Sequence, residues 1–309
     1  GGRGLVLQSN RRGWNAALVA SQNGHEEVLQ RLFEASEGYW RLLFGKVSPD
    51  GWSCSLLASV LGHAGVLRLL NRLCGPAIFK TLTKQGTSCA TISAQNGRLD
   101  ALKTLWECAG REHFSITSAD GTTCAYTAAQ TGQLPCLAFI HSVMGSSFLL
   151  KAKISGRTLV ASASIGGHVA VIEFLAEHCP SEYFLQVETL PDGKTITCAH
   201  TPTINGDVRC LKALYKGGGA DLLRLPSSGR PLPIIAAEHG RIDALRFFCE
   251  VLGTEEALGS KTEKGTSLAW FAALNSRVEA LQLIIDQNLS PLLLSKTPGG
   301  NTPAHAAAR

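Results

Sequence analysis

Residues 86–106 read GTSCATISAQNGRLDALKTLW, and residues 121–141 read GTTCAYTAAQTGQLPCLAFIH. Both stretches place a glycine, a hydroxyl residue, a cysteine, two small residues and a second glycine in the same order. The frame returns every 35–38 residues along the chain, opening at Gly13, Gly51, Gly86, Gly121, Gly156, Gly193, Gly229, Gly265 and Gly300. A fixed period of this length is typical of a repeat protein, in which each repeat packs mainly on its neighbours.

The residues after each opening glycine predict a short helix. Two residues on stands a side chain whose oxygen can cap a helix N-terminus: Asn15, Ser53, Ser88, Thr123, Thr158, Ser267 and Thr302, with Thr197 fitting if the sixth repeat has a two-residue insertion, and Pro231 as the exception. A second glycine, eleven residues after most opening glycines, predicts a left-handed stop. About two turns remain between these signals, which is too short for a helix to be stable alone in water.

Small residue pairs in the middle of the short helix, such as Ala128-Ala129, indicate that neighbouring helices approach closely there. A longer amphipathic helix follows each second glycine, with apolar residues at positions such as Val171, Ile172 and Leu175. Each repeat is therefore predicted to be a helix–turn–helix whose apolar faces are buried between adjacent repeats.

This frame resembles the ankyrin repeat, most closely in GNTPAHAAA at residues 300–308 and in Gly-His pairs such as Gly24-His25. The resemblance implies an all-α, ankyrin-like helix–turn–helix solenoid with β-hairpin-type loops between repeats. We expect one array over residues 1–309, with eight repeats opening near 13, 51, 86, 121, 156, 193, 229 and 265 and a partial ninth from 300. Both ends interrupt the pattern, from which we expect either that the native polypeptide is longer or that short capping segments are missing. Divergent repeats of this kind resemble those in secreted effectors of intracellular bacteria.

The sequence also departs from the ankyrin pattern. The family's proline position holds proline only at Pro303, and its repeat is usually about 33 residues long, shorter than the spacing here. The extra length surrounds an apolar residue seven positions before the opening glycine: Val6, Phe44, Phe79, Phe114, Leu149, Leu222, Leu258 and Leu293. We predict an added turn with this residue buried beneath the loop, worth roughly 1.5–3 kcal/mol for each large side chain.

Composition excludes several classes of protein. The 309 residues are 45% hydrophobic and 17% charged, as in folded proteins rather than disordered ones. The net charge of +5 comes from scattered side chains, so nucleic-acid binding is not expected, and it would require a steep dependence on salt. No apolar run is long enough to cross a bilayer. We expect a monomer without membrane insertion, located in the cytoplasm, or in the host cytosol if the protein is a secreted effector.

The cysteines share a register position in several repeats. Cys54, Cys89 and Cys124 occupy one position in consecutive repeats, and Cys198 fits as a fourth. Stacked helices lie roughly 8–10 Å apart, whereas a disulfide needs Cα atoms within about 7 Å. We therefore expect free, buried thiols.

Candidate catalytic and metal-binding groups are scarce. A zinc site from His178, Cys179, Cys198 and His200 is conceivable across adjacent repeats, but these residues lack the compact spacing of zinc ligands. GGGAD at residues 217–221 is better explained as a helix stop than as a phosphate-binding loop. We predict no metal, no cofactor and no catalytic residues, so the chain is not expected to be an enzyme.

In ankyrin-like proteins, partners contact the loop tips and the exposed end of the short helix. Mapped onto this sequence, the predicted partner-binding residues are Arg12, Trp14, Gln22, Asn23, Asp50, Trp52, Gln95, Asn96, Arg157, Lys194, Arg230, Glu238 and His239. The two tryptophans are candidate hot spots if exposed; the alternative is that their rings fold back onto the repeats. The basic tips of the later repeats suggest an acidic partner or, alternatively, only a solvated rim.

The sequence therefore predicts a protein–protein interaction scaffold that binds a protein or peptide on its concave face. An alternative function is a substrate-recruiting arm of a larger enzyme or secreted effector, with the catalytic domain outside this chain.

Overall fold

The computed structural model describes residues 7–190 and 192–308, and most of these residues are helical. The chain divides into two compact units, an N-terminal unit of residues 1–154 and a C-terminal unit of residues 155–309. The prediction that the whole chain is one continuous array stays a prediction. Among the described residues, no helix is both long enough and apolar enough to span a membrane.

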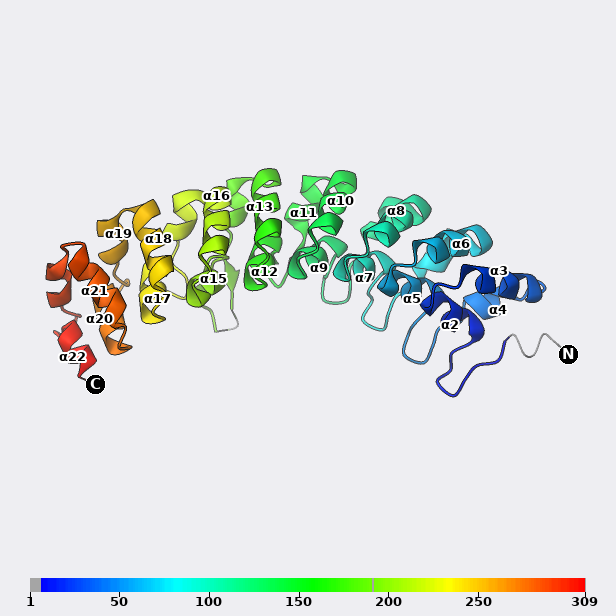
Figure 1. Cartoon of the computed structure of the whole chain (residues 1–309), viewed down its shortest axis with the longest axis horizontal. Helices are drawn as coiled ribbons and strands as arrows, with labels where there is room; N and C mark the ends of the chain where they lie inside the picture. Colours follow the sequence, from blue (N-terminus) through cyan, green and yellow to red (C-terminus); the bar gives the residue numbers. More distant parts are fainter. Residues whose placement is uncertain (1–6, 191, 309) are drawn as a thin grey trace. The chain divides into compact units, whose positions relative to one another are not determined.

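In the N-terminal unit, short inner helices and longer outer helices form two rows, and the connecting loops extend beyond the inner row (Figure 1). The inner helices are α2 (Ala16–Gln22), α5 (Cys54–Leu61), α7 (Cys89–Gln95) and α9 (Cys124–Gln130). The outer helices are α3 (Glu26–Ala35), α6 (Ala64–Cys74), α8 (Leu99–Phe114) and α10 (Leu134–Met144). Each inner helix packs on the next, as α7 does on α5 and α9.

The C-terminal unit repeats this arrangement (Figure 1). Its inner helices are α12 (Leu159–Ile165), α15 (His200–Asn205), α17 (Leu232–Glu238), α20 (Leu268–Leu274) and α22 (Pro303–Ala307). Its outer helices are α13 (Val169–His178), α16 (Val208–Arg224), α18 (Ile242–Leu252) and α21 (Val278–Asp286). The predicted helix–turn–helix repeat is therefore confirmed in both units.

The predicted helix caps explain where the inner helices begin. Each capping side chain accepts the main-chain N–H three residues on, at 3.0–3.4 Å, in Asn15, Ser53, Ser88, Thr123, Thr158 and Ser267. The prediction for Thr197 is wrong. The inserted residues of the sixth repeat move the start of α15 to His200, so Ala199 occupies the cap and the Thr197 hydroxyl is buried without a partner.

The second glycine of several repeats is covered by a side chain of the following repeat. Gly62 ends α5 with φ +85°, and a Cβ there would lie 2.8 Å from Cδ of Arg98. Arg98 Nε donates to the main-chain oxygen of Val60 at 3.1 Å. This contact, which we call a clasp, satisfies a carbonyl that the end of the helix leaves unpaired and places a cation at the negative end of the helix dipole.

The predicted additional turn is a third short helix in each repeat. It is formed by α4 (Trp40–Phe44), η1 (Pro76–Lys80), α11 (Ser146–Lys151), α14 (Ser181–Phe184), α19 (Thr254–Leu258) and η2 (Ser290–Leu294). The predicted anchors Phe44, Phe79, Phe114, Leu149, Leu222 and Leu258 are at most 1% exposed. Leu293 is half-buried, and Val6 lies outside the described residues.

In α8 and α16 the third helix follows the outer helix directly after a glycine whose backbone is not helical. The kinks lie at Gly110, with φ +67°, and at Gly219, with φ +63°. The helix stop predicted at residues 217–221 is therefore confirmed, at Gly219. A second short helical segment follows this glycine, and its Leu222 is buried in the core.

The loops between repeats have the predicted hairpin geometry. In the loop before α9, Ser118 N donates to Thr122 O and Gly121 N donates to Ser118 O, both at 2.9 Å. A longer hairpin in the C-terminal unit forms β3 (Glu188–Thr189) and β4 (Thr195–Ile196), antiparallel with Glu188 opposite Ile196. The remaining strands of the described residues are β1 (Lys153–Ile154) and β2 (Arg157–Thr158).

Candidate functional site

Trp14 and Trp52 occupy the predicted hairpin tips of the first two repeats. Each closes its hairpin through the main chain, because Asn10 N donates to Trp14 O and Ser48 N donates to Trp52 O, both at 2.8 Å. Both tryptophans are half-buried. Their rings are therefore neither fully exposed to solvent nor fully folded back onto the repeats. Their role in binding stays a prediction.

The other predicted residues of the N-terminal unit are exposed, namely Arg12, Gln22, Asn23, Asp50, Gln95 and Asn96. Two of them have a local structural role. Asn23 Nδ2 donates to Val19 O at 2.8 Å, and Asn96 Nδ2 donates to Ile92 O at 2.9 Å. These amides therefore hydrogen-bond the ends of their own inner helices.

Gln95 lines a polar hollow of about 440 Å³ between α7, α9 and two hairpin turns. The hollow is lined by Gln85, Thr87, Thr91, Gln95, Ser118, Ala119, Asp120, Thr122, Thr127 and Gln130. Hydrogen bonding from Thr122, first through its hydroxyl, lowers the pKa of Asp120 and favours its ionised form. The hollow offers amides, hydroxyls and one carboxylate, but no large apolar side chain that could anchor a partner.

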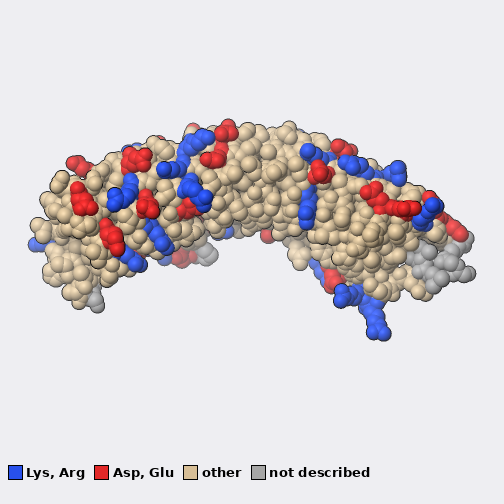
Figure 2. Space-filling view, viewed as in Figure 1, with Lys and Arg blue, Asp and Glu red and all other residues tan. Residues whose placement is uncertain are grey.

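The three predicted basic residues of the C-terminal unit, Arg157, Lys194 and Arg230, are each paired with a carboxylate. Arg157 donates to both oxygens of Glu188, from Nε at 2.9 Å and from Nη2 at 2.8 Å. Lys194 pairs with Asp192 at 2.8 Å, and Arg230 pairs with Glu238. On the face of this unit in view in Figure 2, basic and acidic side chains intermingle. The positive charges of these three side chains are therefore compensated by carboxylates of the same unit.

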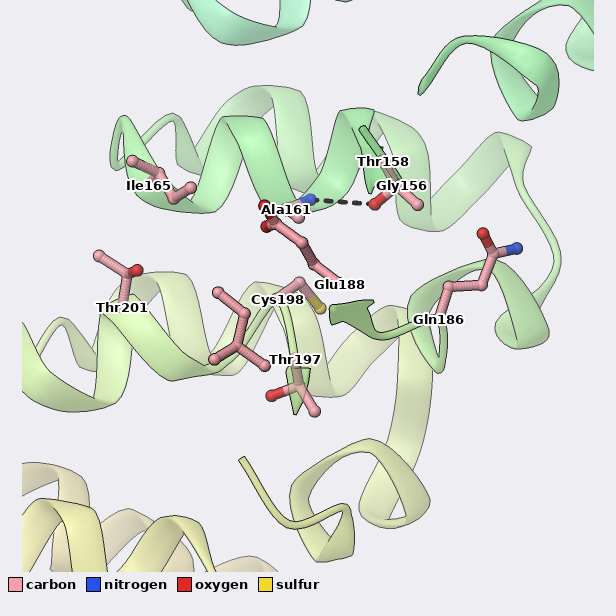
Figure 3. Close-up of a pocket in the computed structure, with 10 residues that line it drawn as sticks. Gly156, Thr158, Ala161, Ile165, Gln186, Glu188, Thr197, Cys198 and Thr201 are labelled. Atoms are coloured by element: carbon pink, nitrogen blue, oxygen red, sulfur yellow. Dashed lines mark hydrogen bonds between the residues drawn. The ribbon is translucent and has the colours of Figure 1, made fainter. Parts of the chain in front are cut away.

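A small cavity lies between α12, α15 and the β3–β4 hairpin (Figure 3). Its volume of about 10 Å³ is room for about one water molecule. Gln186 Oε1 and Thr197 Oγ1, both on lining residues, are buried without hydrogen-bond partners. A ligand larger than a water would not fit in this cavity.

The conceivable zinc ligands are engaged elsewhere. His178 stacks on Phe174 with ring centroids 4.2 Å apart, Cys198 Sγ lies 3.5 Å from the Phe184 carbonyl oxygen, and His200 Nδ1 lies 2.9 Å from Ser227 Oγ. In residues 7–190 and 192–308, no three His, Cys, Asp or Glu side chains are grouped so that they could hold a metal ion.

The buried cysteine positions predicted from the repeat register are confirmed. Cys54, Cys89, Cys124 and Cys198 are buried, and all ten cysteines are free thiols. Burial raises the pKa of Cys54, Cys124 and Cys198 to about 12, which disfavours the reactive thiolate. These residues are therefore core groups.

An apolar stripe lies on the inner helix α20. Its buried side consists of Leu268, Ala269, Ala272 and Ala273, which pack within the unit. On the other side, Trp270 and Phe271 are half-buried, and Leu274 is 38% exposed. The two rings meet edge to face, with centroids 5.2 Å apart and planes at 85°. We call Trp270, Phe271 and Leu274 the α20 stripe.

The α20 stripe adjoins two of the predicted residues, Arg230 and Glu238. The Arg230 guanidinium lies 5.6 Å from the centroid of Phe271, within range of a cation–π interaction. Glu238 holds Arg230 there by their ion pair. Burial, followed by the charges of Arg230 and His239, lowers the pKa of His200. The structure thus brings Arg230 and Glu238 together beside an apolar surface.

The α20 stripe was not predicted, although the composition of residues 268–274 indicated an unusual helix. Every residue of α20 is apolar, in the sequence LAWFAAL at residues 268–274. A helix that is apolar all round must be covered on every side or expose an apolar face. In α7, α9 and α17 the position that corresponds to Leu274 is Gln95, Gln130 and Glu238, respectively.

These observations define the chain as having the ankyrin-repeat fold, and the predicted all-α architecture is confirmed. A similar solved structure is the crystal structure of the ankyrin repeat domain of Bcl-3, described as a unique member of the IkappaB protein family. The TM-score is 0.58 at 16% sequence identity, over 76% of this chain and 100% of the other. At this identity the likeness shows the fold alone. No family model and no curated protein matches the sequence.

Proposed function

We propose that this protein binds a protein or peptide segment on the inner-helix face of its C-terminal unit. The α20 stripe carries the proposal, since it places two aromatic rings and an exposed leucine beside an arginine. Tryptophan and arginine are enriched among the residues that dominate interface energies. The proposal assigns no reaction to this chain.

The surroundings of the stripe fit an interface better than a small-molecule pocket. Arg230 is held between Phe271 and Glu238, so little side-chain freedom would be lost when a partner covers it. An apolar centre with charged groups at its edge is the usual anatomy of a protein interface.

The test uses a display library of random 12-residue peptides, selected on the intact chain. The selected peptides are then titrated against Leu274→Asn, which removes an exposed part of the stripe, and against Val278→Asn. Val278 is 66% exposed on the outer helix of the same repeat and serves as the matched control. We expect binding at least tenfold weaker for Leu274→Asn and within twofold of wild type for Val278→Asn.

Equal affinities for the two variants would contradict the proposed surface, as would a library from which no peptide is enriched. The predicted tips in the N-terminal unit are tested with the same peptides and a Trp14→Ala/Trp52→Ala variant.

A further inference from the structure

Two exposed arginines in consecutive repeats are held in place by clasps. Arg241 Nε donates to the main-chain oxygen of Ile204 at 2.7 Å, and Arg277 Nε donates to that of Glu238 at 3.1 Å. They occupy the same register position, the residue that follows Gly240 in one repeat and Ser276 in the next. Both arginines are exposed.

The clasps use only one side of each guanidinium group. Across the described ranges, the terminal nitrogens of Arg241 and Arg277 have no hydrogen-bond or ion-pair partner. These nitrogens form the part of the fork that binds a carboxylate through two hydrogen bonds. Because Nε is already anchored, a carboxylate would meet a guanidinium that has lost much of its rotamer freedom, which favours binding.

Arg277 also lies beside the α20 stripe. It is three residues after Leu274, and its guanidinium contacts the end of α17 at Glu238. The Glu238 carboxylate is paired with Arg230, so it does not occupy the free side of Arg277. A ligand on the stripe can therefore reach Arg277 without displacing an existing ion pair.

The spacing of the two arginines suits an extended peptide. Packed neighbouring helices are about 8–10 Å apart, so equivalent side chains in adjacent repeats are separated by about that distance. In a polyproline II conformation, residues i and i+3 lie on the same side of the chain about 9 Å apart. Carboxylates at i and i+3 of such a segment would match Arg241 and Arg277.

We infer that the partner of the inner-helix face is an acidic peptide segment. It places an apolar side chain on the α20 stripe and two carboxylates, three residues apart, on Arg241 and Arg277. This inference rests on the proposed function. The corresponding positions in other repeats, His63, Arg98, Gln133, His168 and Asp207, contain no second pair of consecutive arginines.

The test compares Arg241→Gln/Arg277→Gln with Arg98→Gln. Arg98 makes the same clasp in the N-terminal unit but has no arginine at the equivalent position of either adjacent repeat, so it reports the structural effect of losing a clasp. Glutamine is a conservative choice, because Gln133 occupies this register position naturally.

Peptides selected from the 12-residue library on wild type should be enriched in pairs of Asp or Glu three residues apart, near an apolar residue. Measured by fluorescence anisotropy, their affinity should fall at least tenfold in the double variant and less than twofold in Arg98→Gln. Binding to wild type should weaken severalfold between 50 and 200 mM salt, as expected for carboxylate–arginine pairs. The single variants Arg241→Gln and Arg277→Gln, each expected to weaken binding, replace the double variant if it does not fold.

Selected peptides without acidic pairs, or equal binding by wild type and the arginine variants, would overturn the inference. If Leu274→Asn still weakens binding in that case, the proposed function stands and only the acidic chemistry fails. If Leu274→Asn also has no effect, the proposed function fails as well.

Discussion

Glu188 in β3 receives two hydrogen bonds from Arg157 in β2, at 2.9 and 2.8 Å, and its side chain is only 10% exposed. The pair joins the start of one repeat to the long hairpin of the next. A hydrogen bond to a charged group contributes about 1.5–3 kcal/mol, and because the Arg157 side chain is 34% exposed, water can replace part of what this pair contributes.

We therefore expect Glu188→Ala to lower the free energy of unfolding by about 1.5–3 kcal/mol, because it leaves the Arg157 guanidinium without its carboxylate. Urea unfolding of the variant measures this loss. Asp192→Ala, which breaks the exposed Lys194–Asp192 pair, should change stability much less than Glu188→Ala does. If the two substitutions lower stability equally, the Arg157–Glu188 pair contributes no more than an exposed ion pair does.

The clasp predicts that alanine destabilises the protein more at Gly62 than at Gly167, a glycine of the same register. Gly62 has φ +85° and is crowded by Arg98, whereas Gly167 has φ +70°, and a Cβ added there would lie 3.9 Å from its nearest neighbour, Asp207. Alanine at either position costs about 1–2 kcal/mol for the left-handed backbone. Gly62→Ala should cost about 0.5–1.5 kcal/mol more, since Arg98 must leave the Val60 carbonyl.

Thermal or urea unfolding of Gly62→Ala and Gly167→Ala provides the comparison. If both variants lose the same stability, the clasp contributes nothing measurable beyond backbone strain.

His113 predicts a loss of stability at mildly acidic pH. It is 5% exposed, its Nε2 accepts the Ala90 N–H at 3.3 Å, and burial lowers its pKa from 6.5 to about 4. Because the unfolded chain binds the proton more readily, stability should fall as pH drops from 6.5 to 4, by up to about 1.4 kcal/mol per pH unit.

Urea unfolding at several pH values tests this, with His113→Gln as the variant that removes the titrating group. Between pH 6.5 and 4, the free energy of unfolding should change less steeply with pH in the variant. The difference in slope should correspond to about one bound proton. An unchanged slope would mean that His113 is not responsible.

The buried thiols predict a loss of stability at alkaline pH, as the pH rises. Burial raises the pKa of Cys124 from 9.0 to about 12. Above pH 9 the unfolded chain loses this proton while the folded chain keeps it, so stability should fall as pH rises from 9 towards 12. Cys124→Ala should reduce that fall by up to about 1.4 kcal/mol per pH unit.

The same thiol should react with a disulfide reagent at pH 8 only after unfolding, because the thiolate is the reactive form. Rapid modification of Cys124 in the folded protein, located by mass spectrometry, would contradict its burial.

Local signals made most of the fold predictable. A cap such as Ser88 acts on the N–H three residues away, and an anchor such as Phe114 recurs at a fixed distance from its glycine. An exception arose at Thr197, where an insertion moved the start of α15 to His200.

The candidate site was only partly predictable. Arg230 and Glu238 follow from the register of the repeat, but their pairing and the position of Arg230 over Phe271 depend on tertiary contacts. The all-apolar sequence of α20 signalled an unusual helix, yet it could not show which side the neighbouring helices leave exposed.

The sequence by itself determined the period, the two-helix repeat and the buried cysteine row, since hydrogen bonds and apolar spacing within a few residues specify them. Tertiary structure alone decided which charges are neutralised, which arginines are clasped and where an apolar stripe stays open. The physical reason is that these features join side chains about one repeat apart in sequence, such as Arg277 and the carbonyl of Glu238, and only packing brings them within hydrogen-bond distance.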